Sequence, residues 1–273
     1  MDNKIPKQSK MWDYLSGFDK YNKPVPFYVK SPFSDAQVND LKNIINDAKE
    51  KRNLAELKVN TPGNKEESYS LDRFDPRIID HMSRMIIEFE CTKEAEGIMD
   101  SHVLPVYKEP IKLAHYSYLD YNPKYGGGEY LPSLPPHVDG ANTIVTFNYC
   151  LDTNIEWDIY VDNVRYELKK GDALVFSAIN QVHWRPKRKW KDGEFCEILT
   201  FDYSPLDDWR FTNESNPLDY RFYPEFVDNY QKDLGTKKEY IDAWDLYNNL
   251  GLEIGLNEYE HGAWENGTAA NND

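Results

Sequence analysis

The sequence lacks the features that mark several common classes of protein. Its three cysteines, Cys91, Cys150 and Cys196, are odd in number and far apart, so they offer neither a disulfide framework nor a C-x-x-C pair. It has no run of about 18 apolar residues that could cross a bilayer, and its N-terminus has no apolar signal segment. We therefore expect a soluble, cytoplasmic protein with no membrane partner.

Positive charge is also scarce. The 273 residues include 32 basic and 47 acidic ones, for a net charge of -15, so the average surface repels phosphate polymers and nucleic acid is not an expected partner. One basic run, from Arg185 to Lys191, interrupts this acidity. Such a run is usually a solvated strand end or turn, but its position just after His183 leaves a role in a site open.

Hydrophobic periodicity predicts two helices in the first part of the chain. Ser34 and Gln37 have the spacing of a capping box, and apolar residues then recur at helical intervals over 35–51. An Asp-Pro pair at 75–76 predicts the start of a second helix, from about 76 to about 98. No repeat and no long linker divides the chain.

From residue 110 onward the pattern changes to short runs rich in β-branched and aromatic residues, broken by Gly, Pro, Asn and Asp. Strands are predicted at 112–121, 143–151, 156–161, 164–168, 172–177, 181–186 and 195–203. Turns are predicted at Asp162-Asn163, which suits a hairpin, and at 169–172. Helical fragments follow at about 223–232 and 236–249. We thus predict an N-terminal helical flank packing on the core (1–110), a β core (111–205), and a C-terminal helical extension with a frayed tail (206–273).

One histidine motif lies within this β region. His137 is followed two residues later by Asp139, and another histidine, His183, comes on a later predicted strand. With 47 acidic residues in the chain, six histidines give roughly one such pair by chance, so the pair alone could be an ordinary loop. Residues i and i+2 of an extended chain point the same way, so an imidazole and a carboxylate can face one metal, with His183 arriving from across a barrel. Two histidines and one carboxylate leave three positions of an octahedral iron(II) open.

The wider pattern resembles a known family. Tyr121-Asn122-Pro123, a glycine-rich stretch, Tyr130 and His137-Val138-Asp139 are similar to the metal-binding segment of the prolyl hydroxylase-like branch of the 2-oxoglutarate-dependent oxygenases. The segments that follow are similar to that family's later strands in their usual order: 143–152, 168–176, 182–183 and 198–203. The resemblance covers about residues 112 to 205.

The resemblance implies a mainly β fold with flanking α-helices and a double-stranded β-helix (jelly-roll, cupin-like) core. It implies an Fe(II)- and 2-oxoglutarate-dependent dioxygenase in which His137, Asp139 and His183 hold the iron and dioxygen is consumed, with ascorbate in support. Such an enzyme hydroxylates a C–H bond of a peptide, a protein or a small molecule. By analogy alone the first substrate to consider is a prolyl residue.

The cosubstrate residues depart from the family pattern. Tyr121 matches a tyrosine that commonly bonds 2-oxoglutarate, although a buried core tyrosine fits the position equally well. The family's cation for the distal carboxylate would fall at Phe195 or Cys196, neither of which is basic. Arg185, two residues after His183, is the best substitute, with Arg188 and Lys191 in reserve. Alternatively, Arg185 extends into solvent from a strand end.

Two other interpretations remain open at this stage. A cupin-like protein could hold a metal or a small ligand without oxygenase activity, and a different iron oxygenase could draw its electrons from a source other than 2-oxoglutarate. His102 and His115 are weaker candidates for metal binding, because neither is followed by a carboxylate two residues later. For His115, on a predicted strand, a core position is the simpler interpretation.

Overall fold

The structure is a computed structural model, and the residues it describes are 23–51, 78–80, 84–107, 110–126, 132–139, 143–206, 211 and 235–256. The described strands form two sheets, and within each sheet every pair of neighbouring strands is antiparallel. The large sheet has the order β1 (Phe27–Val29), β9 (Ala173–Phe176), β6 (Val145–Thr153), β11 (Cys196–Pro205), β4 (Ile111–Tyr121), β3 (Arg84–Glu88) and β2 (Ile78–Asp80). The small sheet has the order β5 (Leu134–His137), β10 (His183–Arg185), β7 (Ile159–Val161) and β8 (Val164–Tyr166).

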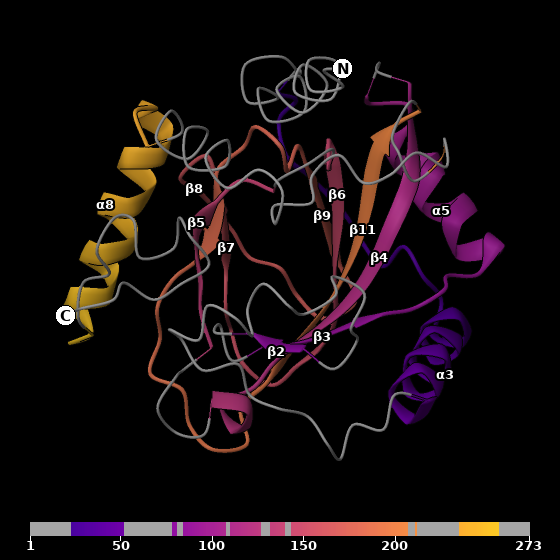
Figure 1. Ribbon diagram of the computed structural model, residues 1–273, viewed down its shortest axis with the longest axis horizontal. Helices are drawn as coiled ribbons and strands as arrows, with labels where there is room; N and C mark the ends of the chain where they lie inside the picture. The colour runs from indigo at the N-terminus through magenta and orange to yellow at the C-terminus, as the bar shows by residue number, and fades with distance from the viewer. Residues whose placement is uncertain are drawn as a thin grey trace, which may run out of the picture.

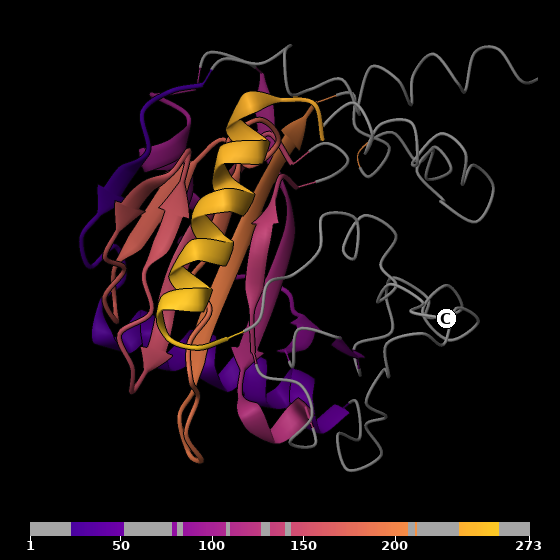
Figure 2. The ribbon, with the colours of Figure 1, turned by 90° about the vertical axis from the view of Figure 1, so that its left-hand side faces the viewer.

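The two sheets face one another, and helices cover their outer sides (Figure 1). Helices α3 (Asp35–Lys51) and α5 (Lys93–Val103) lie beside the large sheet, and α8 (Lys238–Glu253) lies against the small one, as the turned view also shows (Figure 2). A short 3₁₀ helix, η2 (Pro123–Gly126), follows β4. The predicted mainly β fold with flanking helices is therefore confirmed.

Each face of the large sheet is buried against a different layer. On β6, Phe147 and Tyr149 join the cluster under α3 and α5, whereas Cys150 joins the cluster between the sheets. The small sheet contributes Ile159 and Val161 to that inter-sheet cluster. Because successive side chains of a strand point to opposite faces, a strand covered on both sides is buried at consecutive residues, as β6 is from Val145 to Leu151.

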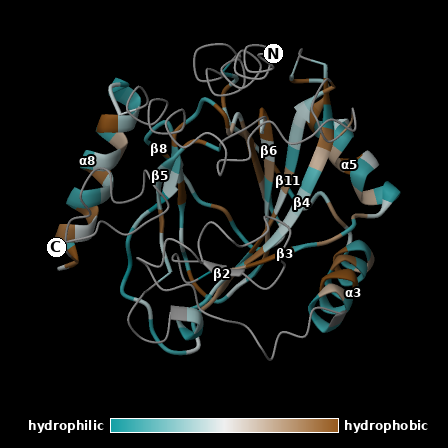
Figure 3. Ribbon diagram, in the orientation of Figure 1, coloured by the Kyte–Doolittle hydropathy of each residue, from teal (hydrophilic) through white to brown (hydrophobic). Residues whose placement is uncertain are grey.

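Helix α8 packs through an aromatic face. Its Tyr240, Trp244 and Tyr247 are buried together with Trp184 of β10. Figure 3 shows that α3 and α8 each carry both hydrophobic and hydrophilic residues, as expected of helices with one face on a core. None of the helices in the described part of the chain is long and apolar enough to span a membrane.

Most of the predicted elements are present. The predicted helix at 35–51 is α3, and its capping box forms, with Ser34 N donating to Gln37 Oε1 at 2.8 Å. The predicted hairpin turn is also correct, since Asp162 and Asn163 have φ of 49° and 62°. Each predicted strand from 112 to 203 corresponds to an observed one. The predicted fragment at 236–249 lies within α8, and the one at 223–232 lies outside the described residues.

The predicted helix at 76–98 is wrong over most of its length. Residues 78–80 and 84–88 form β2 and β3, and a helix begins only at Lys93. In β3 the buried residues alternate, with Met85 and Ile87 packed under the helices and Arg84 and Glu88 on the opposite face. Adjacent apolar pairs, such as Ile78-Ile79 and Ile86-Ile87, fit both a helical and an extended period, so the pattern alone could not separate a strand from a helix.

Strand β5 is not among the predicted strands. It contains two adjacent prolines, Pro135 and Pro136, which are typical of a loop. It lies at the edge of the small sheet, where a residue without an N–H group is tolerated because one side needs no partner. The strand positions the first candidate metal ligand, His137, at its last residue.

Candidate metal centre

The three candidate metal ligands come together between the sheets. His137 ends β5, His183 begins β10, and the two residues are direct cross-strand partners, with ring centroids 4.2 Å apart. Asp139 lies just beyond β5, and its Oδ1 is 3.5 Å from Nε2 of each histidine. One ligand atom from each residue can be chosen so that all lie within 4.8 Å of one another. His183 thus reaches the site from the neighbouring strand and not from across the barrel, as the sequence had suggested.

Backbone carbonyl groups fix the orientation of both imidazoles. His137 Nδ1 lies 2.8 Å from the carbonyl oxygen of Pro135, and His183 Nδ1 lies 3.0 Å from that of Gln181. A carbonyl oxygen only accepts, so each Nδ1 carries the proton and each Nε2 is directed at the site. Asp139 is held by its own N–H, which donates to the carbonyl of Ala178 at 2.8 Å. This arrangement of outer hydrogen bonds is typical of histidines that bind a metal through Nε2.

The electrostatics of the three groups also suit a cation. Burial, followed by the charge of His183, lowers the pKa of His137 to about 3, so this imidazole is neutral. Burial opposes ionisation of Asp139, but the charge of His183 and its hydrogen bond outweigh burial and lower the pKa of Asp139. Burial likewise opposes protonation of His183, but the charge of Asp139 prevails and raises its pKa. The carboxylate of Asp139 and the two Nε2 atoms thus face the point where a metal cation would bind all three groups.

Arg185 is buried between the two sheets, on the strand that also carries His183. Its side chain is 2% exposed, Nη1 donates to the carbonyl oxygen of Trp157, and its guanidinium lies 5.2 Å from the centre of the Trp157 ring. Nη2 is buried with no hydrogen-bond partner. Arg185 therefore does not extend into solvent, and it keeps one charged donor that an anionic ligand could satisfy.

Arg185 also lies near the place where the resemblance expected a cation. Cys196, the first residue of β11, is the cross-strand partner of Tyr121. A hydrogen bond with Cys150, and then the positive charge of Arg185, lower the pKa of the Cys196 thiol to about 7 despite its burial. The charge of Arg185 acts on the Cys150 thiol as well. The charge of the guanidinium thus acts on the side chain that replaces the expected basic residue.

Tyr121 lines the same end of the inter-sheet space. It is 1% exposed, its ring meets Trp157 edge-on with centroids 5.0 Å apart, and its hydroxyl accepts a hydrogen bond from Nη1 of Arg84 at 3.1 Å. The positive charge of Arg84 contributes to lowering the pKa of both His137 and Asp139. Sequence reasoning missed Arg84 because it assigned this segment to a helix. Alternation along β3 would have placed Arg84 on the inner face, next to Tyr121.

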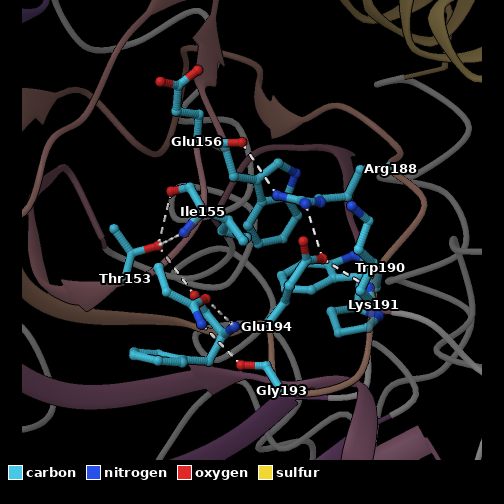
Figure 4. Close-up of polar contacts among 12 residues, drawn as sticks. Thr153, Ile155, Glu156, Arg188, Trp190, Lys191, Gly193 and Glu194 are labelled. Carbon is cyan, nitrogen blue, oxygen red and sulfur yellow. Dashed lines mark hydrogen bonds and ion pairs between the residues drawn. The ribbon is translucent and has the colours of Figure 1, made fainter.

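Arg188, the reserve candidate, has protein partners of its own. Its Nη2 pairs with Glu194 at 2.9 Å, and Nη1 donates to the carbonyl oxygen of Glu156 at 3.3 Å, in the arrangement of Figure 4. It lines a separate surface pocket of about 560 Å³ with both basic and acidic walls. Lys191, the other reserve, bonds Glu194 through its backbone N–H. Within the basic run, Arg185 thus shares the inner face of β10 with His183, because Trp184 between them packs on α8.

In the described part of the chain, the other two histidines, His102 and His115, are not part of this group. His102 lies in the last turn of α5. His115 bonds two carboxylates, Glu88 and Asp202, on the inner face of the large sheet. Among the described residues, His137, Asp139 and His183 are the one group of at least three His, Cys, Asp or Glu side chains close enough to share an ion.

Comparison with known proteins gives matches among solved structures alone. No protein-family model and no curated protein matches the chain. HygX from Streptomyces hygroscopicus, solved with nickel, 2-oxoglutarate and hygromycin B bound, matches with 13% identity over 71% of this chain and 87% of its own, at a TM-score of 0.42. A Pseudomonas putida prolyl-4-hydroxylase matches with 12% identity over 71% and 98%, at a TM-score of 0.43. The viral collagen prolyl hydroxylase of Paramecium Bursaria Chlorella virus-1 matches with 15% identity over 67% and 91%, at a TM-score of 0.38.

All three TM-scores are below 0.5. The structural neighbours of the chain include 2-oxoglutarate- and iron(II)-dependent oxygenases and, among them, prolyl hydroxylases, all at low sequence identity.

Proposed function

We propose that this protein is an iron(II)- and 2-oxoglutarate-dependent dioxygenase, with the metal bound by His137, Asp139 and His183. One observation carries the proposal: two Nε2 atoms and one carboxylate converge between the sheets, and Arg185 keeps a buried, unpartnered donor in the same space. Two imidazoles and one carboxylate leave several positions of an octahedral metal open, which suits non-haem iron. A structural zinc site would instead require four protein ligands.

The roles of the protein residues follow from where each lies. His137 and His183 offer their Nε2 atoms to the metal, held in place by the Nδ1 hydrogen bonds, and Asp139 supplies the negative charge. Arg185 binds the distal carboxylate of 2-oxoglutarate through Nη2, and Tyr121 packs on the same Trp157 ring as Arg185. The apolar side chains between the sheets, such as Leu119 and Ile198, exclude water from the methylene groups of the cosubstrate. When bound, iron(II) with 2-oxoglutarate and dioxygen supplies the oxidising power for hydroxylation of a C–H bond.

The burial of Arg185 also bears on the rival proposal of a cupin-like protein without oxygenase activity. That proposal requires no cation inside the barrel, and it would gain support from an Arg185 exposed to solvent. Burying a guanidinium with an unsatisfied N–H donor costs free energy unless an anion accepts a hydrogen bond from that donor. A dicarboxylate cosubstrate provides such an anion. The prolyl residue of a peptide or protein remains a proposed substrate from the sequence resemblance, and no contact in the described residues selects it.

The test is succinate formation from 2-oxoglutarate with iron(II), ascorbate and air, together with direct measurement of metal affinity. We expect His183→Ala to abolish succinate formation and to weaken binding of iron(II) by roughly 100-fold or more, since one of three ligands is lost. His102→Ala is the matched control, because that histidine lies on α5, and it should leave both quantities unchanged. Wild-type protein that binds iron(II) but forms no succinate with any substrate class would contradict the proposal.

A further inference from the structure

One asparagine of β6 is directed at the space between the two sheets. Cys150 of β6 belongs to the cluster between the sheets, so Asn148, two residues earlier on the same strand, points the same way. Leu174, the cross-strand partner of Asn148 on β9, belongs to the same cluster. The Asn148 side chain therefore lies on the inner face of the large sheet, which faces the strand that carries His183 and Arg185.

Asn148 is a buried polar group that lacks a protein partner. It is 8% exposed, and its Oδ1 is buried with no hydrogen-bond partner in the part of the chain that the structure describes. Arg185 has a buried, unpartnered Nη2 between the same two sheets. A buried amide or guanidinium group without a hydrogen bond costs free energy. Two such groups between the sheets indicate a ligand that satisfies both.

Asn148 lies close to the level of the candidate metal ligands. Two residues before Asn148 on β6, Thr146 pairs with Phe176 of β9. The centroid of the Phe176 ring is 4.8 Å from that of the His183 ring. Residues two apart on a strand are separated by about 7 Å, so Asn148 is in the next row of cross-strand partners along the sheet.

Arg185 lies toward the other end of the same strands. Its guanidinium and the ring of Tyr121 contact one and the same ring, that of Trp157. The row that contains Asn148 crosses β4 four residues before Tyr121. Along the strands, Asn148 thus lies between the level of the candidate metal ligands and the level of Arg185.

The polarity of the inner face changes between these two levels. The row of Asn148 is polar, because it continues with Thr200 of β11 and Ser117 of β4. The next row toward Arg185 belongs to the buried cluster between the sheets and consists of Cys150, Ile198 and Leu119. In 2-oxoglutarate, a polar 2-oxo-acid end is followed by two methylene groups and then by a carboxylate. The polar row, the apolar row and Arg185 follow one another in the same order.

We propose that Asn148 is a cosubstrate-binding residue, whose amide donates a hydrogen bond to the 2-oxo-acid end of 2-oxoglutarate while Arg185 binds the distal carboxylate. This inference rests on the proposed oxygenase function. An amide side chain has an acceptor and a donor group, and rotation about its last bond exchanges their positions, so Nδ2 can face a ligand oxygen. The amide then orients the end of the cosubstrate that binds the metal, and the guanidinium holds the other end.

The experiment measures ligand binding to the iron(II)-loaded protein by titration calorimetry under anaerobic conditions. The ligands are 2-oxoglutarate and pyruvate, which has the 2-oxo-acid end but no distal carboxylate. Asn148→Leu keeps a similar side-chain volume and removes the amide. We expect it to weaken binding of both ligands by about tenfold, the value of one hydrogen bond to a charged group. Arg185→Met should weaken binding of 2-oxoglutarate and leave that of pyruvate unchanged, so the two variants assign the two ends of the ligand.

A second measurement separates a ligand contact from a structural role. Because Oδ1 of Asn148 has no partner among the described residues, Asn148→Leu should not lower the urea concentration at the midpoint of unfolding of the metal-free protein. Asn154→Leu is the control variant, because Asn154 lines the surface pocket and its Nδ2 donates to the carbonyl oxygen of Gly193 at 2.9 Å. It should leave the binding of both ligands unchanged. If Asn148→Leu fails to fold, Asn148→Ala removes the same amide.

Four results would overturn the inference. They are unchanged binding of 2-oxoglutarate in the Asn148 variant, an equal loss in Asn154→Leu, a loss for 2-oxoglutarate but not for pyruvate, and a lower urea midpoint in Asn148→Leu. Failure of the oxygenase proposal looks different, because iron(II)-loaded wild-type protein would then not bind 2-oxoglutarate. Wild-type protein that binds 2-oxoglutarate, together with an Asn148 variant that binds it equally well, refutes the role of Asn148 alone.

Discussion

Replacement of Arg185 by methionine tests the cosubstrate site most directly. The substitution keeps much of the length of the side chain and removes the buried charge, including the Nη2 donor that has no partner in the protein. If Arg185 binds the distal carboxylate of 2-oxoglutarate in a bidentate manner, two charge-assisted hydrogen bonds are lost, worth about 3–4 kcal/mol together. The KM for 2-oxoglutarate should then rise roughly 150- to 1,000-fold.

The free energy of unfolding should respond very differently. Arg185→Met removes the hydrogen bond to the Trp157 carbonyl and the contact with the Trp157 ring, which are stabilising. It also removes the cost of burying a guanidinium with an unsatisfied donor, which is of opposite sign. We expect these effects nearly to cancel, leaving the free energy of unfolding within about 1 kcal/mol of the wild type. A large loss of cosubstrate affinity in a protein of normal stability is the signature of a ligand contact.

The assay measures succinate formation against 2-oxoglutarate concentration at saturating iron(II), with chemical denaturation in parallel. Arg188→Met is the matched control, because Arg188 is three residues away and pairs with Glu194 at the surface pocket. It should leave the KM for 2-oxoglutarate unchanged. Arg185→Lys keeps the charge but not the planar fork, so it should recover part of the lost affinity. An unchanged KM in Arg185→Met, or an equal rise in Arg188→Met, would refute the assignment.

Two further predictions concern stability. The pKa of His115 is raised to about 9 in the folded protein, from an ordinary value near 6.5, so its contribution is full below about pH 6.5 and is lost as the pH rises through 9. We compare the free energy of unfolding of the wild type with that of His115→Gln by urea denaturation. The difference between them should fall by about 1–2 kcal/mol between pH 6.5 and 9.5, a value that is reduced because the His115 side chain is partly exposed. A difference that does not change with pH would contradict this prediction. Phe201→Ala should cost about 3–5 kcal/mol in the same assay, because Phe201 is fully buried and its ring meets those of Phe33, Phe89 and Phe147; a loss below about 1 kcal/mol would contradict the packing.

The β core could be predicted from sequence because its turns carry local signals. The Asp162-Asn163 pair adopts positive φ, and Gly171, with φ of 85°, lies in the other predicted turn. Between such turns, strand length and the β-branched and aromatic content left little ambiguity. The segment at 78–88 had no comparable signal, since its apolar residues satisfy both a helical and an extended period. Only pairing with β4 determines which one forms.

The candidate metal ligands could be proposed for a related reason. His137 and Asp139 are two residues apart, and that spacing alone places them on one side of an extended chain. The position of His183 depends on which strands are neighbours. The sequence therefore predicted that His183 belongs to the group, but not the side from which it approaches. In the structure it pairs directly with His137. The cluster around His115 depends still more on pairing, because Glu88, His115 and Asp202 come from three strands far apart in the chain.

Arg185 shows why spacing along the chain is a weak guide to a binding cation. The resemblance expected a basic residue at the start of the last core strand, where Cys196 stands next to Tyr121. A dicarboxylate requires a positive charge at a point in space, and any strand that reaches this point can supply the charge. In the site that we propose, strand β10 of the facing sheet supplies this charge, because Arg185 shares the face of His183 and its charge helps to lower the pKa of the Cys196 thiol. A cation missing from its expected position is therefore evidence against cosubstrate binding only when the facing sheet offers none.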